Sequence, residues 1–374
     1  MLLSLLACIE EVKETGLVDT ADADTDTDTD TDTDTDTDAD ADTDTLPTMA
    51  LVATVADDYS AGVLATVSLA DWTTTDSITT SPTDIGLDYD DGAIYLMGRW
   101  GSDYVRKYAP GSWDEPTWEV STGSKSNPYV ARECGGKLFV TLYGRKNLGV
   151  YDPATGVAAG TVDISAYDDG DGYPEASSMV ESDGKLYVAL NQLDQDNRWV
   201  ANGGKIIEVD CASMSVTQDW AAEPNPSIHT WPGMGMVVTT GVYDTPADGA
   251  VYGFSPDTGL SAALWTETAE LGDLAGAAMV DATHGLLLTT DADSVTTAWC
   301  YADGGTTQLM QTNSYISGVV PVGDGATVWV LGRYNYANPD STGGIAVIDA
   351  LSCADHTASG WHTLGFSPSA VAFY

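Results

Sequence analysis

Seven short apolar strands, spaced 42 to 50 residues apart, predict an all-β fold built from seven copies of one unit. Each strand follows a tight turn and leads to a second strand that ends in Asp or Pro. Self-similarity at this period, with four short strands per unit, is typical of a β-propeller. The sequence therefore predicts seven four-stranded blades, with six blades as the alternative. The seven strands cover residues 51–55, 94–98, 138–142, 186–190, 236–240, 286–290 and 328–332.

Tight turns precede most of these strands. Gly, and to a lesser extent Asp, accepts the left-handed backbone conformation that a two-residue hairpin turn requires. We expect this turn at Asp91-Gly92, Gly135-Gly136, Asp183-Gly184, His284-Gly285 and Asp324-Gly325.

The two ends of the repeat region complete each other. The first unit has no strand before residues 51–55, whereas residues 367–374 read as a strand with nothing after it. This last strand is similar to residues 81–88, which open the second unit. We therefore expect residues 367–374 to join the first blade, because ring closure removes the open sheet edges.

Two units match a known repeat pattern. Lys185-Leu-Tyr-Val-Ala189 and Gly344-Ile-Ala-Val-Ile-Asp349 resemble the repeats of YVTN and NHL-type propeller proteins. The resemblance implies a propeller domain that covers residues 48–374.

The N-terminus resembles a bacterial lipoprotein signal. Leu5, Leu6, Ala7 and Cys8 fit the four-residue lipobox, in which the chain is cut before the Cys. The resemblance implies that residues 1–8 are a signal and that Cys8 is lipidated and anchors the protein to the outer membrane or cell surface of a bacterium. No Lys or Arg precedes the short apolar run, which departs from the pattern and fits a truncated start.

Residues 9–47 read as a disordered acidic tether. Residues 21–44 are twelve consecutive Ala-Asp or Thr-Asp dipeptides. Such a segment has no large apolar side chain to bury, and its charges repel each other, so it stays extended. O-glycosylation of its Thr residues and weak Ca²⁺ binding by its Asp residues are alternative roles.

The net charge of −44 constrains the partners. The first 45 residues hold 16 of the 57 acids and one of the 13 bases, so the rest still carries −29. This acidity argues against nucleic acid and anionic lipid headgroups as ligands. It favours solubility, with a divalent cation or a basic partner as the alternative.

Four cysteines remain beyond Cys8, and an even number in an exported chain favours disulfides. Cys134 and Cys211 both fall in turns on one face of neighbouring units, and Cys300 and Cys353 lie in the last two units. We favour the pairs Cys134–Cys211 and Cys300–Cys353, with the two other pairings left open.

The scarce positive charges recur at equivalent places. Gly-Arg follows the apolar strand in three units, and aromatic residues accompany it. Arg among aromatic residues suits carboxylated or hydroxylated ligands, including sugars. The alternative is that each Arg pairs with a nearby Asp and the rings pack between blades. The candidate ligand-binding residues are Arg99, Trp100, Tyr143, Arg145, Arg198, Trp199, Arg333 and Tyr334.

One acidic loop is a candidate cation site. Asp168, Asp169, Asp171 and Glu175 alternate with Gly and could wrap Ca²⁺, although the loop lacks the full twelve-residue pattern. A plain acidic turn is the alternative. No cofactor is otherwise expected.

Familiar catalytic signatures are absent from the sequence, which favours a non-catalytic, monomeric propeller that binds a glycan, peptide or protein. The alternative is a metal-dependent enzyme similar to a lactonase or lyase, with Asp84, Glu175 and Asp273 as metal ligands in the central funnel. A third possibility is a structural head in an envelope complex.

Overall fold

The computed structural model describes residues 46–374, apart from positions 202, 232–234, 243–244, 246 and 357–360. The chain divides into two units, residues 1–44 and 45–374, and the fold concerns the second. Cys8 and all but the last two residues of the acidic tether lie outside the described residues, so the lipid anchor and the tether stay predictions. In the described part, no helix is both long and apolar enough to cross a membrane.

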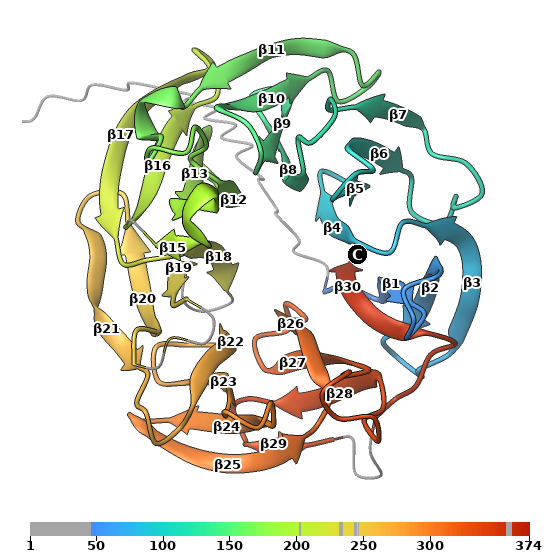
Figure 1. The fold of residues 1–374 in the computed structure, drawn as a ribbon. Coiled ribbons are helices and arrows are strands. Elements are labelled where there is room, and N and C mark those ends of the chain that lie inside the picture. The colour runs from blue at the N-terminus through green and yellow to red at the C-terminus, as the bar shows by residue number, and fades with distance from the viewer. Residues whose placement is uncertain (1–45, 202, 232–234, 243–244, 246, 357–360) are drawn as a thin grey trace, which may run out of the picture. The chain divides into compact units, whose positions relative to one another are not determined.

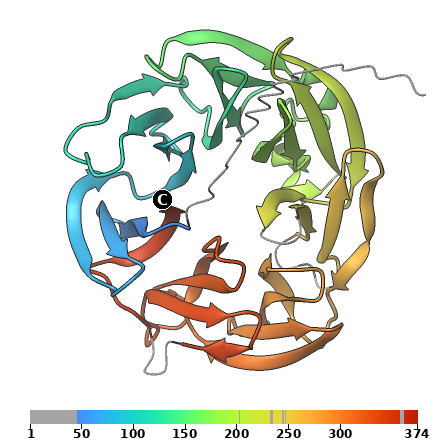
Figure 2. The same ribbon diagram turned by 180° about the vertical axis from the view of Figure 1, so that it is seen from behind.

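The described residues form seven four-stranded antiparallel sheets, arranged as blades around a ring (Figures 1 and 2). The prediction of seven blades is confirmed, and the six-bladed alternative is wrong. From the inner to the outer strand, blades 1 to 4 are β30 (Ser367–Phe373), β1 (Met49–Val55), β2 (Gly62–Ser68), β3 (Thr74–Ser81); β4 (Ile85–Asp90), β5 (Ala93–Gly98), β6 (Tyr104–Tyr108), β7 (Trp118–Ser121); β8 (Pro128–Cys134), β9 (Lys137–Leu142), β10 (Asn147–Tyr151), β11 (Ala158–Asp163); and β12 (Ala176–Ser182), β13 (Lys185–Leu190), β16 (Gly204–Asp210), β17 (Ser215–Ala222).

Blades 5 to 7 repeat this arrangement with β18 (Ser227–Trp231), β19 (Gly235–Thr240), β20 (Ala250–Ser255), β21 (Gly259–Thr266); β22 (Asp273–Met279), β23 (His284–Thr290), β24 (Thr296–Ala302), β25 (Gly305–Thr312); and β26 (Tyr315–Pro321), β27 (Thr327–Arg333), β28 (Gly344–Asp349), β29 (Ala354–Asp355). Two short 3₁₀ helices, η1 (Ser165–Tyr167) and η2 (Gln195–Asn197), interrupt the strands. A small hairpin of β14 (Leu193–Asp194) and β15 (Val200–Ala201) is inserted in blade 4. The sequence did not reveal this hairpin.

The core lies between the blades, in seven apolar clusters that each join two neighbouring blades of the described part. Residues of one strand alternate between the clusters on its two sides, as the pleat of a strand requires. In β1, Ala50 and Val52 pack toward blade 7, whereas Leu51 and Ala53 pack toward blade 2. Burial on both sides explains why the second strand of each blade is a continuous apolar run.

The C-terminal strand closes the ring. β30 pairs with β1 from Ala50 opposite Phe373 to Val55 opposite Ser367. Beyond this pairing, the backbone N–H groups of Met49 and Tyr374 each donate to the carbonyl oxygen of the other residue, at 3.0 and 2.9 Å. The predicted closure is therefore confirmed.

Three of the five expected turns have the positive-φ dipeptide, and two do not. Asp91, Gly92, Gly135, Gly136, Asp183 and Gly184 all have positive φ. In the turn before β27, Gly323 and Gly325 have positive φ but Asp324 does not, and its carboxylate accepts the backbone N–H groups of Ala326 and Thr327. His284 and Gly285 instead lie within β23. The turn before β23 is closed by the Asp281 carboxylate, which accepts hydrogen bonds from the backbone N–H groups of Thr283 and His284, both at 2.7 Å. A side chain thus replaces the positive-φ dipeptide.

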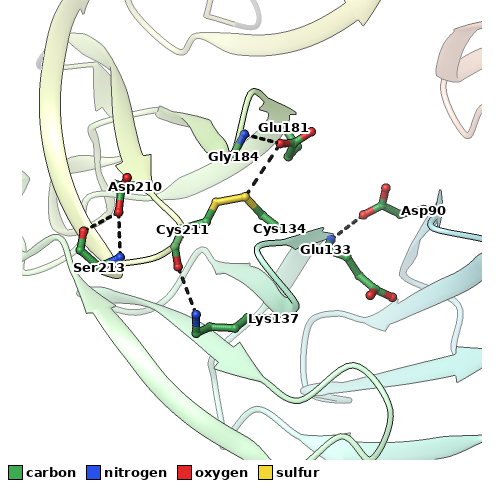
Figure 3. Close-up of a disulfide and its surroundings, with 9 residues drawn as sticks. All are labelled: Asp90, Glu133, Cys134, Lys137, Glu181, Gly184, Asp210, Cys211 and Ser213. Atoms are coloured by element: carbon green, nitrogen blue, oxygen red, sulfur yellow. Dashed lines mark hydrogen bonds between the residues drawn. A yellow bond between two sulfur atoms is a disulfide. The ribbon is translucent and has the colours of Figure 1, made fainter. Parts of the chain in front are cut away.

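Two disulfides join neighbouring blades, which confirms that disulfides are present, and their pairs are the ones the sequence favoured. Cys134–Cys211 links blades 3 and 4, and Cys300–Cys353 links blades 6 and 7. Figure 3 shows the first bond beside Lys137, whose ammonium donates to the carbonyl oxygen of Cys211 at 3.3 Å.

Candidate functional site

The seven blades place equivalent loops on the same face of the ring. The second strand of every blade ends on one face, where the loops to the third strand lie beside the connections between blades. We call this the loop face, and the opposite side, which carries the tight turns, the turn face. All eight predicted ligand-binding residues lie on the loop face, at or after the end of a second strand.

Arg99 and Tyr143 are engaged at the seam between blades 2 and 3. The Arg99 guanidinium pairs with Asp84 at 2.6 Å and lies 4.7 Å from the ring centre of Tyr129. Tyr143 stacks on the same Tyr129 ring, with the ring centres 4.9 Å apart. Tyr143 is buried, and this burial raises the pKa of its hydroxyl. These contacts are those expected if the residues support the loops.

The Arg145 guanidinium forms hydrogen bonds with backbone carbonyl oxygens, whereas that of Arg99 pairs with a carboxylate. Its guanidinium donates to the carbonyl oxygens of Gly144 at 2.9 Å and Lys125 at 3.4 Å, and also to that of Ser124. Arg145 thereby ties the loop after β9 to the connection that enters blade 3.

Arg333 and Tyr334 belong to an aromatic group at the seam between blades 7 and 1. The Arg333 guanidinium lies 4.7 Å from the ring centre of Tyr59. Tyr334 meets Tyr336 edge to face at 5.1 Å, and the Tyr336 hydroxyl donates to the carbonyl oxygen of Asp57 at 2.6 Å.

The remaining predicted residues project outward. Trp100 is 72% exposed and Trp199 is 42% exposed. Arg198 and Trp199 lie between η2 and β15, in the inserted hairpin, with φ of 60° and 61°.

The acidic loop before blade 4 does bring carboxylates together. Oxygen atoms of Asp168, Asp169 and Asp171 lie within 4.8 Å of one another, so the cluster could hold a metal ion. Glu175 is fully buried and accepts hydrogen bonds from the Leu193 N–H at 3.2 Å and the Gln195 amide at 2.9 Å. Burial raises the pKa of Glu175 to about 8, and the charges of Asp171 and Asp169 act in the same direction.

A second acidic cluster was not anticipated. Asp248, Glu267 and Asp273 approach one another in the same way near the start of blade 6. Asp273 therefore belongs to this group, whereas Asp84 pairs with Arg99 and Glu175 contacts Leu193 and Gln195. In the described residues, these three acids do not form the shared metal group considered for an enzyme.

The innermost strands carry two partly buried polar contacts. Arg132 of β8 pairs with Asp88 of β4 at 2.6 Å, and Nε2 of His229 lies 2.8 Å from the Ser227 hydroxyl on β18. Burial, with a smaller contribution from the charge of Arg132, lowers the pKa of His229 to about 4. So low a pKa makes His229 a weak general base at neutral pH, despite its contact with a serine.

Two adjacent clefts open among blades 5 to 7. The outer cleft, of about 470 Å³, lies between blades 6 and 7, and the inner cleft, of about 240 Å³, lies nearer the centre of the ring. Neither is lined by any of the eight predicted ligand residues, whose role in binding stays a prediction. The outer cleft is defined by Gln311, Asn313, Ser314, Asp340, Ser341 and Trp361. The inner cleft is defined by Asn225, Thr290, Ser294, Ser314, Tyr315 and Asn335.

Local backbone pairing places Trp361 in the outer cleft. The segment that carries it runs beside β28, because Ile345 and His362 exchange two backbone hydrogen bonds of 2.9 Å. The indole lies against Gly332, where a Cβ atom would come within 2.7 Å of the ring. A glycine at this position therefore makes room for the indole.

Hydrogen bonds of uncharged side chains hold the other walls of the two clefts in place. The buried Ser314 hydroxyl donates to the carbonyl oxygen of Thr342 at 2.6 Å. The Ser341 hydroxyl accepts the backbone N–H of Asn335 at 2.7 Å. The amide of Asn335 donates to the carbonyl oxygen of Ser294 at 3.4 Å. These bonds fix the loop after β27 between the two clefts.

Comparisons with known proteins identify the fold. No protein-family model and no curated protein sequence matches the chain. A Bacteroides uniformis protein that carries the provisional name 6-phosphogluconolactonase has a TM-score of 0.62 at 12% identity, covering 88% of this chain and all of its own. A Bacteroides fragilis protein with the same provisional name has a TM-score of 0.59 at 11% identity, covering 90% and 100%.

A third similar structure is BamB from Moraxella catarrhalis, with a TM-score of 0.43 at 14% identity, covering 74% of this chain and 80% of that one. The two Bacteroides structures, whose TM-scores exceed 0.5, show the propeller fold alone. Membership in the YVTN or NHL repeat families stays a prediction.

Proposed function

We propose that this protein is a non-catalytic binding module that takes a glycan in the outer cleft. The observation that carries the proposal is the lining of that cleft, which combines one indole with amide and hydroxyl groups. Aromatic faces pack against the C–H faces of sugar rings, while amides both donate to and accept from sugar hydroxyls. The cleft volume of about 470 Å³ suits a small ligand.

Isothermal titration of a panel of oligosaccharides with a Trp361→Ala variant tests this role. We expect the affinity to fall at least tenfold, or about 1.4 kcal/mol, because the stacking surface is lost. Trp100→Ala is the matched control, since Trp100 is 72% exposed on the same face and lines neither cleft. Unchanged binding by a folded Trp361→Ala variant would exclude the outer cleft.

Trp361 also packs against the rest of the protein, so its replacement could abolish binding by disturbing the fold. A second variant that leaves the fold intact separates these two causes. Asn313 is exposed at the rim of the cleft, and Asn313→Ala should weaken binding without lowering the melting temperature. Wild-type affinity in this variant as well as in Trp361→Ala would contradict the proposal.

The proposed role needs no cofactor. Asp340 is the one carboxylate among the residues that define the outer cleft, which is too few for a Ca²⁺ site of six to eight oxygen ligands. EDTA should therefore leave glycan affinity unchanged. Loss of binding in EDTA would instead implicate an acidic cluster, such as that of Asp168, Asp169 and Asp171.

The proposed location is the bacterial cell envelope, on the surface or in the periplasm, with Cys8 as the lipidated anchor. Fractionation of a Cys8→Ser variant tests this location. The variant should lose its acyl chains and become soluble, whereas membrane association at the wild-type level would contradict the anchor.

A further inference from the structure

We propose that the ligand is an uncharged oligosaccharide that occupies the outer and inner clefts together, with successive sugar units on either side of Ser314. This inference rests on the proposed function and specifies its ligand.

The two clefts are separated by a partition only one side chain thick. Ser314 lines both of them. In the neighbouring segment, which leads into β24, Val295 lines the outer cleft, whereas Ser294 and Thr296 line the inner one. Ser294 lies in a tight turn, with φ of 60° and its N–H donating to the carbonyl oxygen of Asp291. Ser314 itself is buried, and its exposed neighbours Asn313 and Tyr315 line the outer and the inner cleft. A linear ligand therefore passes from one cleft to the other over this short segment.

The same chemistry recurs in the inner cleft. Tyr315 is 52% exposed there and offers a ring for stacking, as Trp361 does in the outer cleft. The amides of Asn225 and Asn335 and the hydroxyl of Thr290 supply donors and acceptors. Leu274, Ala275 and Ile316 also line the inner cleft, so it is more apolar than the outer one. Each cleft nevertheless has one aromatic ring with amide and hydroxyl groups, which suits a ligand made of repeating units. At about 240 Å³, the inner cleft alone is smaller than an ordinary ligand pocket.

The negative charge in and around the two clefts disfavours the binding of acidic sugars. Asp340 is the one charged residue among those that line the two clefts, and it is negative. Residues 46–374 as a whole carry a net charge of −29. A uronate or sulfated chain would meet repulsion both locally and at a distance, whereas a neutral chain would meet none.

The test compares chain length and charge on one panel. Tetrasaccharides of glucose and of N-acetylglucosamine, the two monosaccharides and tetragalacturonate are titrated against the full-length protein, with NMR for weak binding. We expect a neutral tetrasaccharide to bind at least tenfold more tightly than its monosaccharide and more tightly than tetragalacturonate.

Variants of the inner cleft then separate this inference from the proposed function. Tyr315→Ala and Asn225→Ala should weaken tetrasaccharide binding about tenfold and leave monosaccharide binding unchanged. Tyr173→Ala, an exposed tyrosine of the acidic loop that lines neither cleft, is the control and should bind normally.

Three results would overturn the inference. If inner-cleft variants bind normally while Trp361→Ala fails, the ligand uses one cleft, so the proposed function stands and the inference falls. Tighter binding of tetragalacturonate contradicts the selection by charge. If no panel member binds, the proposed function and the inference fail together.

Discussion

The loop face is built differently in blades 2 to 4 and in blades 5 to 7. In blades 2 to 4, charged side chains turn back into their own loops, as Arg99, Asp103 and Arg145 do. In blades 6 and 7, with the adjoining edge of blade 5, side chains that are uncharged except for Asp340 line open clefts. We call these the braced sector and the open sector. Arg333 and Glu267 of the open sector are engaged in the same way as the charged residues of blades 2 and 3.

Asp103 shows how the braced sector works. Its buried carboxylate accepts the backbone N–H groups of Lys125 at 2.7 Å and Asn127 at 2.9 Å, and also the Ser126 hydroxyl at 3.3 Å. These partners belong to the connection between blades 2 and 3. One carboxylate therefore accepts hydrogen bonds from three consecutive residues of this loop. The contrast teaches that Arg99, Asp103 and Arg145 serve loop structure, whereas the clefts of the open sector are lined almost entirely by neutral residues.

The largest expected effect comes from the disulfide beneath the open sector. Cys300→Ala with Cys353→Ala should lower the free energy of unfolding by about 2–5 kcal/mol, because this bond closes a long loop. Glycan affinity well below the melting temperature should not change, since the bond joins strands away from the clefts. Urea titration and calorimetric binding measure the two quantities, with the Cys134/Cys211 pair as control. Lost binding in a folded variant would show that the open sector depends on this covalent link.

Removing the Asp103 carboxylate should come next. Asp103→Ala leaves two backbone donors without their acceptor and should cost about 2–4 kcal/mol. Asp340→Ala, an exposed acid of the open sector, should change stability by no more than about 0.5 kcal/mol. If urea denaturation shows that both variants lose the same free energy of unfolding, the distinction between the two sectors is wrong.

The three recurring arginines decide between the sequence-based and structure-based sites. Replacing Arg99, Arg145 and Arg333 by Ala should destabilise the fold by about 1–3 kcal/mol in total, because ion pairing, ring contacts and backbone bonds are lost. Tetrasaccharide affinity should remain at the wild-type value. Tenfold weaker binding with an unchanged melting temperature would restore these arginines as ligand contacts.

The last expected effect is a pH dependence at Glu175. Its pKa of about 8 lies above the ordinary 4.5, so the folded protein retains a proton that the unfolded chain loses between these values. The stabilisation from this proton is complete below pH 4.5 and declines as the pH rises toward 8. Melting temperatures in EDTA at pH 5 and pH 8 should therefore differ less for Glu175→Gln than for wild type. An identical pH dependence in both proteins would contradict the raised pKa.

The sequence predicted the fold because the relevant signals are local and repeated. A strand buried on both sides must be apolar along its length, so β5, β9 and β13 are visible as apolar runs. Closure could be inferred because the missing strand of blade 1 matches residues 367–374. The turn before β23 was missed because a side chain, Asp281, closes it instead of a glycine dipeptide.

The clefts could not be predicted in this way. Gln311, Asp340 and Trp361 come from three segments that meet only in the folded ring, and each is an ordinary residue type. The arginines attracted notice because they recur at equivalent positions. Their partners, such as Tyr129 for Arg99 and Tyr59 for Arg333, lie in neighbouring blades, so their contacts were hidden until the blades were in place.

The pairing of β1 with β30 has a mechanical consequence. The two strands are antiparallel, and Met49 lies directly beside Tyr374. A force that pulls these two residues apart would load one hydrogen-bonded pair at a time and open the strands as a zipper. The same pair would resist a force directed along the strands far better, because all of its hydrogen bonds would share the load. The direction of pull, more than its size, therefore decides how readily the ring can be opened.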